Sequence, residues 1–395
     1  MLSRAEAETR HHRVRSAMAD QGIDALVGFA SKDQPGAVRY LTGFEPWCAA
    51  GEWALVVITM EGPAQVYTNS PWDVLDGEWT NTPWVEICVG TAWDDPSVRI
   101  PSRATETVAH IRSQFWPGLI SRGVQKRSGR ARTVNGTSLL EGLRAIKTPY
   151  EVKRLATANQ IAWDALIDAR DLIRPGTTER AVAARIAEAI EGRHVVGLSY
   201  PTTLMSGPRT ACICARPSTT PMEAGQLLQI DCSPIVDGYS ADVSWVFPIG
   251  DPTGDQKRLL SASRTASASL AATLMPGTDA RGMTAAAEEA LGTHGLSLLN
   301  LYWSVGGSGA FLAHGVGLGN PDPPGVFTTA HTQAPLQQGM VVNVEPIVMI
   351  DGVGSARTEA AFLISSESGP PGLLGSESST RLLPARLDDE WPASL

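Results

Sequence analysis

The chain has 395 residues, more than one ordinary hydrophobic core fills, so two or three domains are expected. Hydrophobic residues make up 43% and charged residues 18%, which is typical of a soluble globular protein, and the net charge of −9 argues against a nucleic acid or a membrane surface as partner. The five cysteines form no Cys-x-x-Cys pattern, and no secretory signal or membrane-spanning run is apparent. We therefore expect a cytoplasmic protein without a disulfide framework.

The first third of the chain alternates between helical and strand patterns. A charged helical pattern over residues 3–22 precedes strand-like runs at 23–29 and 52–60, and a further helix is expected near 111–123. This alternation predicts an α/β domain. The polar stretch at 128–138 reads as a linker, so we expect an N-terminal domain over residues 1–135 and a second domain over 136–395.

The second domain opens with two long helical stretches between residues 139 and 192, the first interrupted near Pro149. The second stretch follows the turn Pro175-Gly176-Thr177. The same three residue types recur at Pro276-Gly277-Thr278, again ahead of a helical pattern. Two such turns in one domain hint at an internal pseudo-repeat.

Four carboxylates and one histidine carry the clearest chemical signal, because most of them stand in apolar, strand-like stretches. They are Asp231, Asp242, His314, Glu345 and Glu359. A lone ionised carboxylate in such a setting costs several kcal/mol, and four together would repel one another and take up protons. Two divalent cations would cancel the four charges, so the pattern predicts a buried two-metal site of the kind that performs hydrolysis. Oxygen ligands with one imidazole suit Mn²⁺, Fe²⁺ or Co²⁺, and Zn²⁺ is an alternative.

The contexts of these residues resemble the creatinase/aminopeptidase P family of M24, or pita-bread, metallohydrolases. The similar stretches are RAIKTPYEVKRL, LIRPGTTE, LLQIDCSPIVDGYSADVSWVF, AHGVGLG, QQGMVVNVEP and GVGSARTEAAFLI. The resemblance implies an α/β N-terminal domain and an α+β pita-bread C-terminal domain, in which a curved antiparallel sheet encloses the metals. It also implies a homodimer, and it implies that Asp231, Asp242, His314, Glu345 and Glu359 are the metal ligands, with Glu345 also moving protons.

Two positions depart from the peptidases of this family. The peptidases carry a histidine 17 residues before the first aspartate and another seven residues after the metal histidine. This chain has Cys214 and Pro321 at these two positions. Those histidines hold the scissile carbonyl and stabilise the oxyanion, and a donor of that kind contributes roughly 3–4 kcal/mol to the transition state. The substitutions therefore leave more than one reaction open.

Other residues are candidates to complete the site. Arg209 lies in SGPRT, which resembles the dimethylsulfoniopropionate lyase branch of the fold; it could bind a carboxylate or form a structural salt bridge. Arg357 matches a family arginine that orients a ligand. His331 could replace a missing histidine or lie at the surface. Glu345, Arg357 and Arg209 are thus the predicted catalytic residues.

Three functions remain in competition. The first is a metal-dependent hydrolase that cleaves a C–N bond in a small molecule or dipeptide, as Xaa-Pro peptidases do. The second is a non-peptidase acting on a specialised metabolite, either a lyase or a creatinase-like hydrolase. The third is a binding protein without activity, against which the complete ligand set argues.

Overall fold

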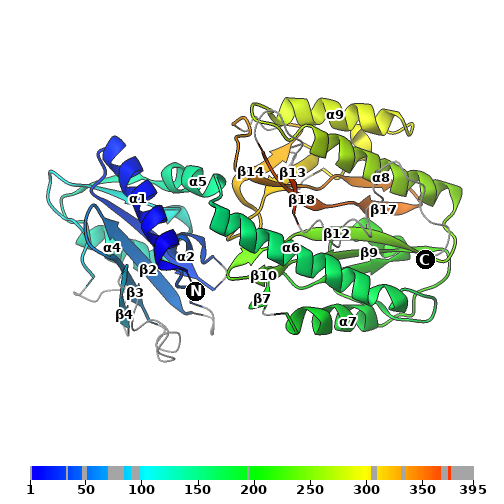
Figure 1. Cartoon of the computed structure of the whole chain (residues 1–395), viewed down its shortest axis with the longest axis horizontal. Helices are drawn as coiled ribbons and strands as arrows, with labels where there is room; N and C mark the ends of the chain where they lie inside the picture. Colours follow the sequence, from blue (N-terminus) through cyan, green and yellow to red (C-terminus); the bar gives the residue numbers. More distant parts are fainter. Residues whose placement is uncertain are drawn as a thin grey trace. The chain divides into compact units, whose positions relative to one another are not determined.

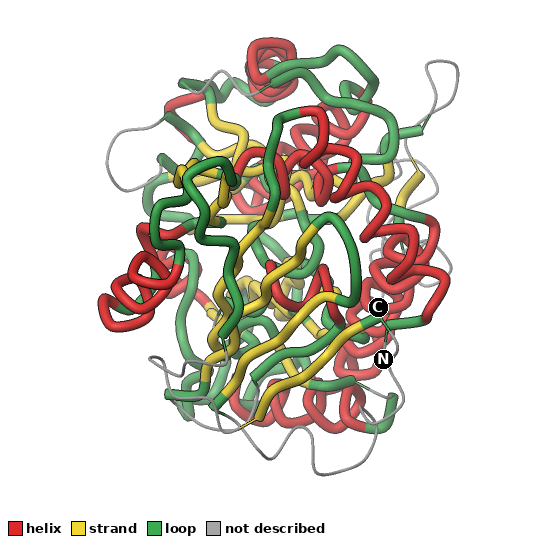
Figure 2. The backbone as a smooth tube through the Cα atoms, turned by 90° about the vertical axis from the view of Figure 1, so that its left-hand side faces the viewer, coloured by secondary structure: helices red, strands yellow, loops and turns green. Residues whose placement is uncertain are grey.

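The computed structural model describes residues 2–32, 34–46, 51–69, 84–89, 98–193, 195–303, 309–330, 334–365 and 372–374. The chain divides into two compact units, Met1–Arg144 and Ala145–Leu395. Figure 1 labels their helices and strands, and Figure 2 colours the same backbone by secondary structure from a second direction. No helix in the described part of the chain is long and apolar enough to span a membrane.

The N-terminal unit is built on a mixed sheet. Its described strands follow the order β4-β3-β2-β1-β5-β6, with β1 antiparallel to β2 and parallel to β5. The elements are α1 (Arg4–Asp20), β1 (Ala25–Ser31), α2 (Gly36–Thr42), β2 (Trp53–Thr59), β3 (Ala64–Thr68), β4 (Val85–Val89), β5 (Thr107–His110), α4 (Gly118–Arg127), β6 (Arg132–Asn135) and α5 (Thr137–Ala145). The predicted helix at 3–22 and the two predicted strands are therefore present as α1, β1 and β2.

Two local predictions in this unit are wrong. The expected linker at 128–138 contains β6, which pairs in parallel with β5. The expected helix near 111–123 is only a 3₁₀ turn at Ser113–Phe115 in its first half, and α4 begins after Pro117. A residue that precedes proline avoids the helical conformation, so the helix cannot run through this point.

The C-terminal unit places helices on both sides of antiparallel strands. In Figure 1, α8 and α9 lie on one side of the strands, and α6 and α7 lie on the other. The helices are α6 (Pro149–Ala169), α7 (Glu179–Glu191), α8 (Gly254–Ala272) and α9 (Ala280–Gly292). The interruption expected near Pro149 is the start of α6, where Thr148 and Glu151 form a capping box.

The two Pro-Gly-Thr turns occupy matching positions. The backbone N–H of Gly176 donates to Met222 O, and that of Met222 donates to Thr177 O. The backbone N–H of Gly277 likewise donates to Leu336 O, and that of Leu336 donates to Thr278 O. Gly176 and Gly277 have φ angles of +87° and +93°, which glycine adopts without strain. This shared bonding pattern, between α6 and α7 and between α8 and α9, supports the internal pseudo-repeat.

The strands of this unit contain the predicted ligands or end directly beside them. They are β7 (Gly197–Leu198), β8 (Thr203–Ser206), β9 (Gln226–Cys232), β10 (Pro234–Val236), β11 (Tyr239–Ser240), β12 (Val243–Ile249), β13 (Phe311–Gly315), β14 (Asp322–Thr328), β15 (Val341–Val344), β16 (Ile347–Ile350), β17 (Gly354–Arg357), β18 (Ala360–Leu363) and β19 (Gly372–Leu373). Described strands form the orders β12-β9-β8 and β14-β13-β15-β18-β19. A bridge between Ser244 and Glu359 joins β12 to the residue before β18, so the two sheets meet beside the predicted ligands.

Candidate metal centre

A hairpin brings the two aspartates together. β9 runs antiparallel to β12, with Asp231 opposite Ser244. Between these strands, Asp237 and Gly238 have φ angles of +48° and +88° and reverse the chain between β10 and β11. Asp231 lies near the end of β9 and Asp242 directly precedes β12, so the fold of the hairpin places both carboxylates at one site.

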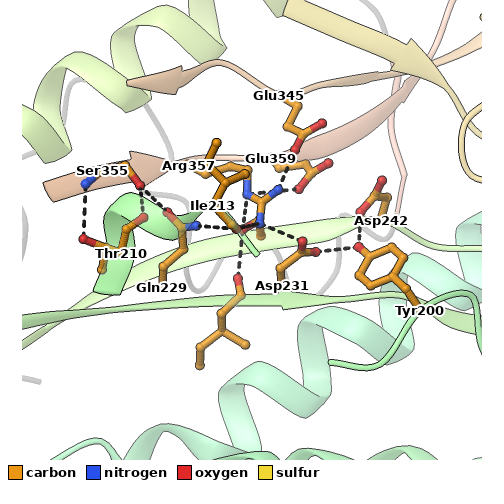
Figure 3. Close-up of polar contacts among 12 residues, drawn as sticks. Tyr200, Thr210, Ile213, Gln229, Asp231, Asp242, Glu345, Ser355, Arg357 and Glu359 are labelled. Carbon is orange, nitrogen blue, oxygen red and sulfur yellow. Dashed lines mark hydrogen bonds and ion pairs between the residues drawn. The ribbon is translucent and has the colours of Figure 1, made fainter. Parts of the chain in front are cut away.

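All five predicted ligands converge on this point. Figure 3 shows the four carboxylates, which lie in β9 or directly beside β12, β15 and β18. None of the five side chains is more than 10% exposed to solvent. The five residues are Asp231, Asp242, His314, Glu345 and Glu359.

The His314 ring lies against three of the carboxylates. Its Nε2 atom is 3.1 Å from Asp242 Oδ2, 3.4 Å from Glu345 Oε2 and 3.6 Å from Glu359 Oε1. Its Nδ1 atom is 3.0 Å from the carbonyl oxygen of Gly315. A proton on Nδ1 satisfies this carbonyl and leaves the Nε2 lone pair directed at the carboxylate oxygens, as in metal-binding histidines.

Arg357 occupies the other side of the cluster. Its Nη2 donates to Asp231 Oδ2 at 2.7 Å, and its Nη1 donates to Glu345 Oε1 at 2.6 Å. Nε donates to Ser244 Oγ at 3.0 Å. Figure 3 shows the guanidinium directed at Asp231, Glu345 and Glu359, and its Nε atom lies 3.9 Å from Glu359 Oε2. Arg357, predicted as an orienting residue, therefore fixes one oxygen of each of two ligands.

Three polar side chains that the sequence did not single out also contact the ligands. The Tyr200 hydroxyl is 2.5 Å from Asp231 Oδ1 and 2.6 Å from Asp242 Oδ1. Asn320 Nδ2 donates to Asp242 Oδ2 at 2.8 Å, and Asn343 Nδ2 donates to Glu359 Oε1 at 2.6 Å. One hydroxyl proton cannot serve two carboxylates at once, so the Tyr200 contacts leave a charge unsatisfied between the aspartates.

Burial and mutual repulsion shift the pKa values of the clustered groups. Burial, opposed by Arg357 and aided by Asp242, raises the pKa of Asp231 to about 7. Burial and the nearby charges of Asp242 and Glu345 raise the pKa of Glu359 well above its ordinary value. Against the effect of burial, the hydrogen bond from His314 lowers the pKa of Asp242, and hydrogen bonds to Asp242, Glu345 and Glu359 raise the pKa of His314 well above its ordinary value. Without a metal, the imidazole and the Arg357 guanidinium together offset the carboxylate charge.

The ligand atoms fit a divalent cation. Asp242, His314 and Glu359 each offer one ligand atom, and these atoms lie within 4.8 Å of one another. Glu359 Oε2 is buried, and within the described part of the chain it has no hydrogen-bond partner. An imidazole nitrogen beside carboxylate oxygens is a donor set for Mn²⁺, Fe²⁺, Co²⁺ or Zn²⁺.

Arg209, the third predicted catalytic residue, binds a carboxylate outside the cluster. Arg209 Nη1 donates to Glu179 Oε2, and Arg209 Nη2 donates to the carbonyl oxygen of Arg216 at 2.8 Å. Glu179 is fully buried and also accepts hydrogen bonds from the backbone N–H groups of Ser206 and Ser218. Of the two roles expected for Arg209, the structure therefore shows the structural salt bridge. None of its hydrogen bonds to described residues involves the five predicted ligands.

The two positions that lack the family histidines border the site. Cys214 is exposed as a residue, but its thiol is partly buried beside Arg357; burial raises the pKa of the thiol, and the guanidinium opposes this rise. Pro321 directly follows Asn320, whose amide reaches Asp242. His331 lies outside the described residues.

Comparison with known proteins identifies the family. Residues 153–366, more than half of the chain, match metallopeptidase family M24. The chain belongs to metallopeptidase family M24. Residues 10–146 of this M24 protein match the creatinase/prolidase N-terminal domain. The predicted family is therefore confirmed.

The M24 chain is similar to proteins named Xaa-Pro dipeptidase. It is 27% identical over 239 residues to that of Pyrococcus furiosus and 25% identical over 232 residues to that of Lactobacillus helveticus. These stretches cover 60% and 58% of this chain, and 66% and 60% of those two proteins. The match thus spans less than two thirds of the curated relatives' length.

Solved structures of relatives share the fold over nearly the whole chain. The prolidase from Pyrococcus furiosus has a TM-score of 0.75 at 21% identity, covering 92% of this chain and 99% of that chain. The X-Pro aminopeptidase from Thermotoga maritima has a TM-score of 0.77 at 20% identity, covering 92% and 96%. The predicted fold, an α/β N-terminal domain followed by an α+β pita-bread domain, is confirmed.

Proposed function

We propose that this M24 protein is a metal-dependent hydrolase that cleaves the amide bond of a small substrate, with an Xaa-Pro dipeptide as the first candidate. One observation carries the proposal: Asp242, His314 and Glu359 present ligand atoms within 4.8 Å of one another inside a buried cluster. Membership of the M24 family and the relatives named Xaa-Pro dipeptidase support it.

We propose that two divalent cations, with Mn²⁺, Fe²⁺ or Co²⁺ preferred over Zn²⁺, complete the site. Asp242, His314, Glu345 and Glu359 would hold one ion, and Asp231, with Asp242 and Glu359 shared, would hold the other. When bound, such ions polarise a carbonyl and lower the pKa of a water molecule.

Side chains of the protein orient the carboxylates and transfer protons. Arg357 binds Glu345 through Oε1, while Oε2 faces His314, so Glu345 is held in one orientation and can accept and return a proton. Arg357 and Tyr200 together fix both oxygens of Asp231. Burial of these groups keeps water away and strengthens each of these interactions.

Asn320 is our candidate for the amide donor that the site needs. Its Nδ2 atom already donates to Asp242, and its side chain is only partly buried, so the group lies at the edge of the cluster. A side-chain amide is an effective donor to a developing oxyanion. Cys214 and Pro321 cannot supply an equivalent donor.

The lyase and creatinase-like alternatives are not favoured. The feature that pointed to the lyase branch was Arg209, and this guanidinium is bound to Glu179. We further propose a cytoplasmic homodimer, with residues 1–135 as the creatinase-like domain and 136–395 as the catalytic domain. These proposals rest on the composition and the family resemblance, and sedimentation of the purified protein tests the dimer.

A direct assay tests the activity. The full-length protein is stripped of metal, reloaded with Mn²⁺ and offered alanyl-proline beside alanyl-alanine. We expect cleavage of the proline dipeptide only in the reloaded protein. A folded, metal-loaded protein that cleaves neither dipeptide would refute the dipeptidase proposal, and cleavage by the stripped protein would refute the metal requirement.

A further inference from the structure

A strained turn borders the carboxylate cluster. The backbone N–H of Cys214 donates to the carbonyl oxygen of Cys212 at 2.6 Å, which closes a three-residue turn around Ile213. Ile213 has φ +63° and ψ −51°, close to the rare and strained form of the γ-turn. Positive φ is unfavourable for a β-branched residue, and such strain persists where the surroundings enforce it.

The turn carries a cysteine at each of its two ends. Cys212 and Cys214 are both free and exposed to solvent. Two fully extended residues span about 7 Å, and a hydrogen-bonded turn is shorter. The two Cα atoms therefore fall within the about 4.4–6.8 Å range that a disulfide bridges.

The same turn is attached to the metal ligands through Arg357. The carbonyl oxygen of Ile213 accepts a hydrogen bond from Arg357 Nη2 at 3.3 Å, and this same nitrogen donates to Asp231. Ser355 Oγ donates to the carbonyl oxygen of Thr210 at 2.6 Å, which fixes the preceding residues to β17. Figure 3 shows both attachments. A change in the turn would therefore move the group that positions Asp231.

We propose that Cys212 and Cys214 form a modification site, at which a hydroperoxide converts the two thiols into a reversible intramolecular disulfide. One thiolate attacks a peroxide oxygen and becomes a sulfenic acid as water or an alcohol leaves. The second thiol attacks that sulfur, the S–S bond forms, and the sulfenic oxygen leaves as water. Two thiols are oxidised, and one peroxide is reduced.

The disulfide would act on the cation site. Closing the S–S bond restrains Cys212 and Cys214 and shifts the Ile213 carbonyl between them, which weakens its hydrogen bond to Arg357. We expect the affinity of the oxidised protein for Mn²⁺ to fall by about 10-fold, since partners that orient metal ligands typically contribute 10–100-fold. The formation of the disulfide does not depend on the proposed function, whereas its effect on Mn²⁺ does.

Mass spectrometry tests the modification. The reduced, full-length protein is treated with hydrogen peroxide, its remaining thiols are alkylated, and intact and peptide masses are measured. We expect loss of two hydrogen atoms, a disulfide between Cys212 and Cys214, and reversal by dithiothreitol. C212S and C214S should each abolish the cross-link, and the control C88S should retain it. Oxygen addition without a cross-link, disulfide-linked chains, or no reaction would overturn the proposal.

Calorimetric titration with Mn²⁺ tests the coupling between the disulfide and the affinity for Mn²⁺. We expect weaker binding by the oxidised protein, recovery on reduction, and no response to peroxide in C212S. Equal affinity of the oxidised and reduced forms would overturn the coupling. If neither form bound Mn²⁺, the proposed metal site would fail, while the disulfide would still be judged by its mass.

Discussion

The two sides of the carboxylate cluster differ in how their charge is balanced. Asp231 and Glu345 each accept a hydrogen bond from the Arg357 guanidinium. Asp242 and Glu359 instead accept hydrogen bonds from the neutral amides of Asn320 and Asn343. An arginine side chain keeps its charge at any relevant pH, so one side carries a permanent internal cation.

This difference indicates how a site with four carboxylates folds before a metal arrives. The guanidinium holds two ligands at fixed positions through separate nitrogens, which a planar fork does better than an ammonium group. On the other side, the nearest cation to Asp242 is the imidazole of His314 at 3.1 Å, whose charge depends on pH, and Glu359 Oε2 lies 3.9 Å from Arg357 Nε without a hydrogen bond. The fold therefore fixes one side in advance and leaves the other for an external cation.

The largest effect is expected for Asp242→Ala. Asp242 contacts His314, Tyr200 and Asn320, so its loss removes the ligand that joins the two sides. We expect loss of bound metal and a fall in kcat/KM of roughly 10³-fold or more, because metal ions contribute several kcal/mol to the transition state. Metal analysis and dipeptide kinetics measure this. The exposed control Asp251→Ala should change neither quantity, and full activity in metal-free Asp242→Ala would refute the account.

Arg357→Met should separate stability from metal binding. It leaves Asp231 and Glu345 buried without their charge partner, which costs about 3–5 kcal/mol in the metal-free protein. Added Mn²⁺ should restore part of this loss, because the freed carboxylates gain a new cation. Urea unfolding with and without Mn²⁺ measures both effects. Arg264→Met, at another buried arginine, provides the control. An Arg357→Met protein that is as stable as wild type without metal would contradict the proposed difference between the two sides of the cluster.

Tyr200→Phe tests the contact between the two aspartates. Removing the hydroxyl frees Asp231 Oδ1 and Asp242 Oδ1 and should weaken Mn²⁺ binding by about 10–100-fold, as for other groups that orient metal ligands. Calorimetry measures the affinity. Tyr239→Phe is the matched control, since that hydroxyl bonds to Glu151, outside the cluster. Equal loss in both variants would show that general destabilisation, rather than orientation, is responsible.

The smallest effect is expected for Ile213→Gly. Glycine accepts the positive φ of this position, so relief of strain should raise the free energy of unfolding by about 1 kcal/mol. A more mobile turn should also hold Arg357 less firmly and lower the affinity for Mn²⁺. Denaturant unfolding gives the first quantity, and a decrease in stability would show that strain at Ile213 does not outweigh the loss of its half-buried side chain.

Local chemistry in the sequence pointed to the residues of the carboxylate cluster. Asp231, Asp242 and Glu345 stand in apolar contexts where a carboxylate requires a partner, and this requirement is visible without a structure. The helix starts at Thr148 and Thr178 are also local, because the capping side chain and the N–H group that it accepts from lie three residues apart.

Contacts between distant segments were not visible in this way. Tyr200 reaches Asp231 and Asp242 across 31 and 42 residues, and Arg357 reaches Asp231 across 126 residues. These contacts depend on how two sheets meet, which no local pattern encodes. β6 was missed for another reason: it lies at the edge of its sheet, and its largely exposed residues lack an apolar alternation.

Metal analysis of the purified wild-type protein and of Asp242→Ala tests the central claim most directly. The account predicts about two divalent cations per wild-type chain, as a two-metal hydrolase requires, and loss of metal in the variant. A folded wild-type protein that binds no divalent cation when supplied with Mn²⁺, Fe²⁺, Co²⁺ or Zn²⁺ would contradict it.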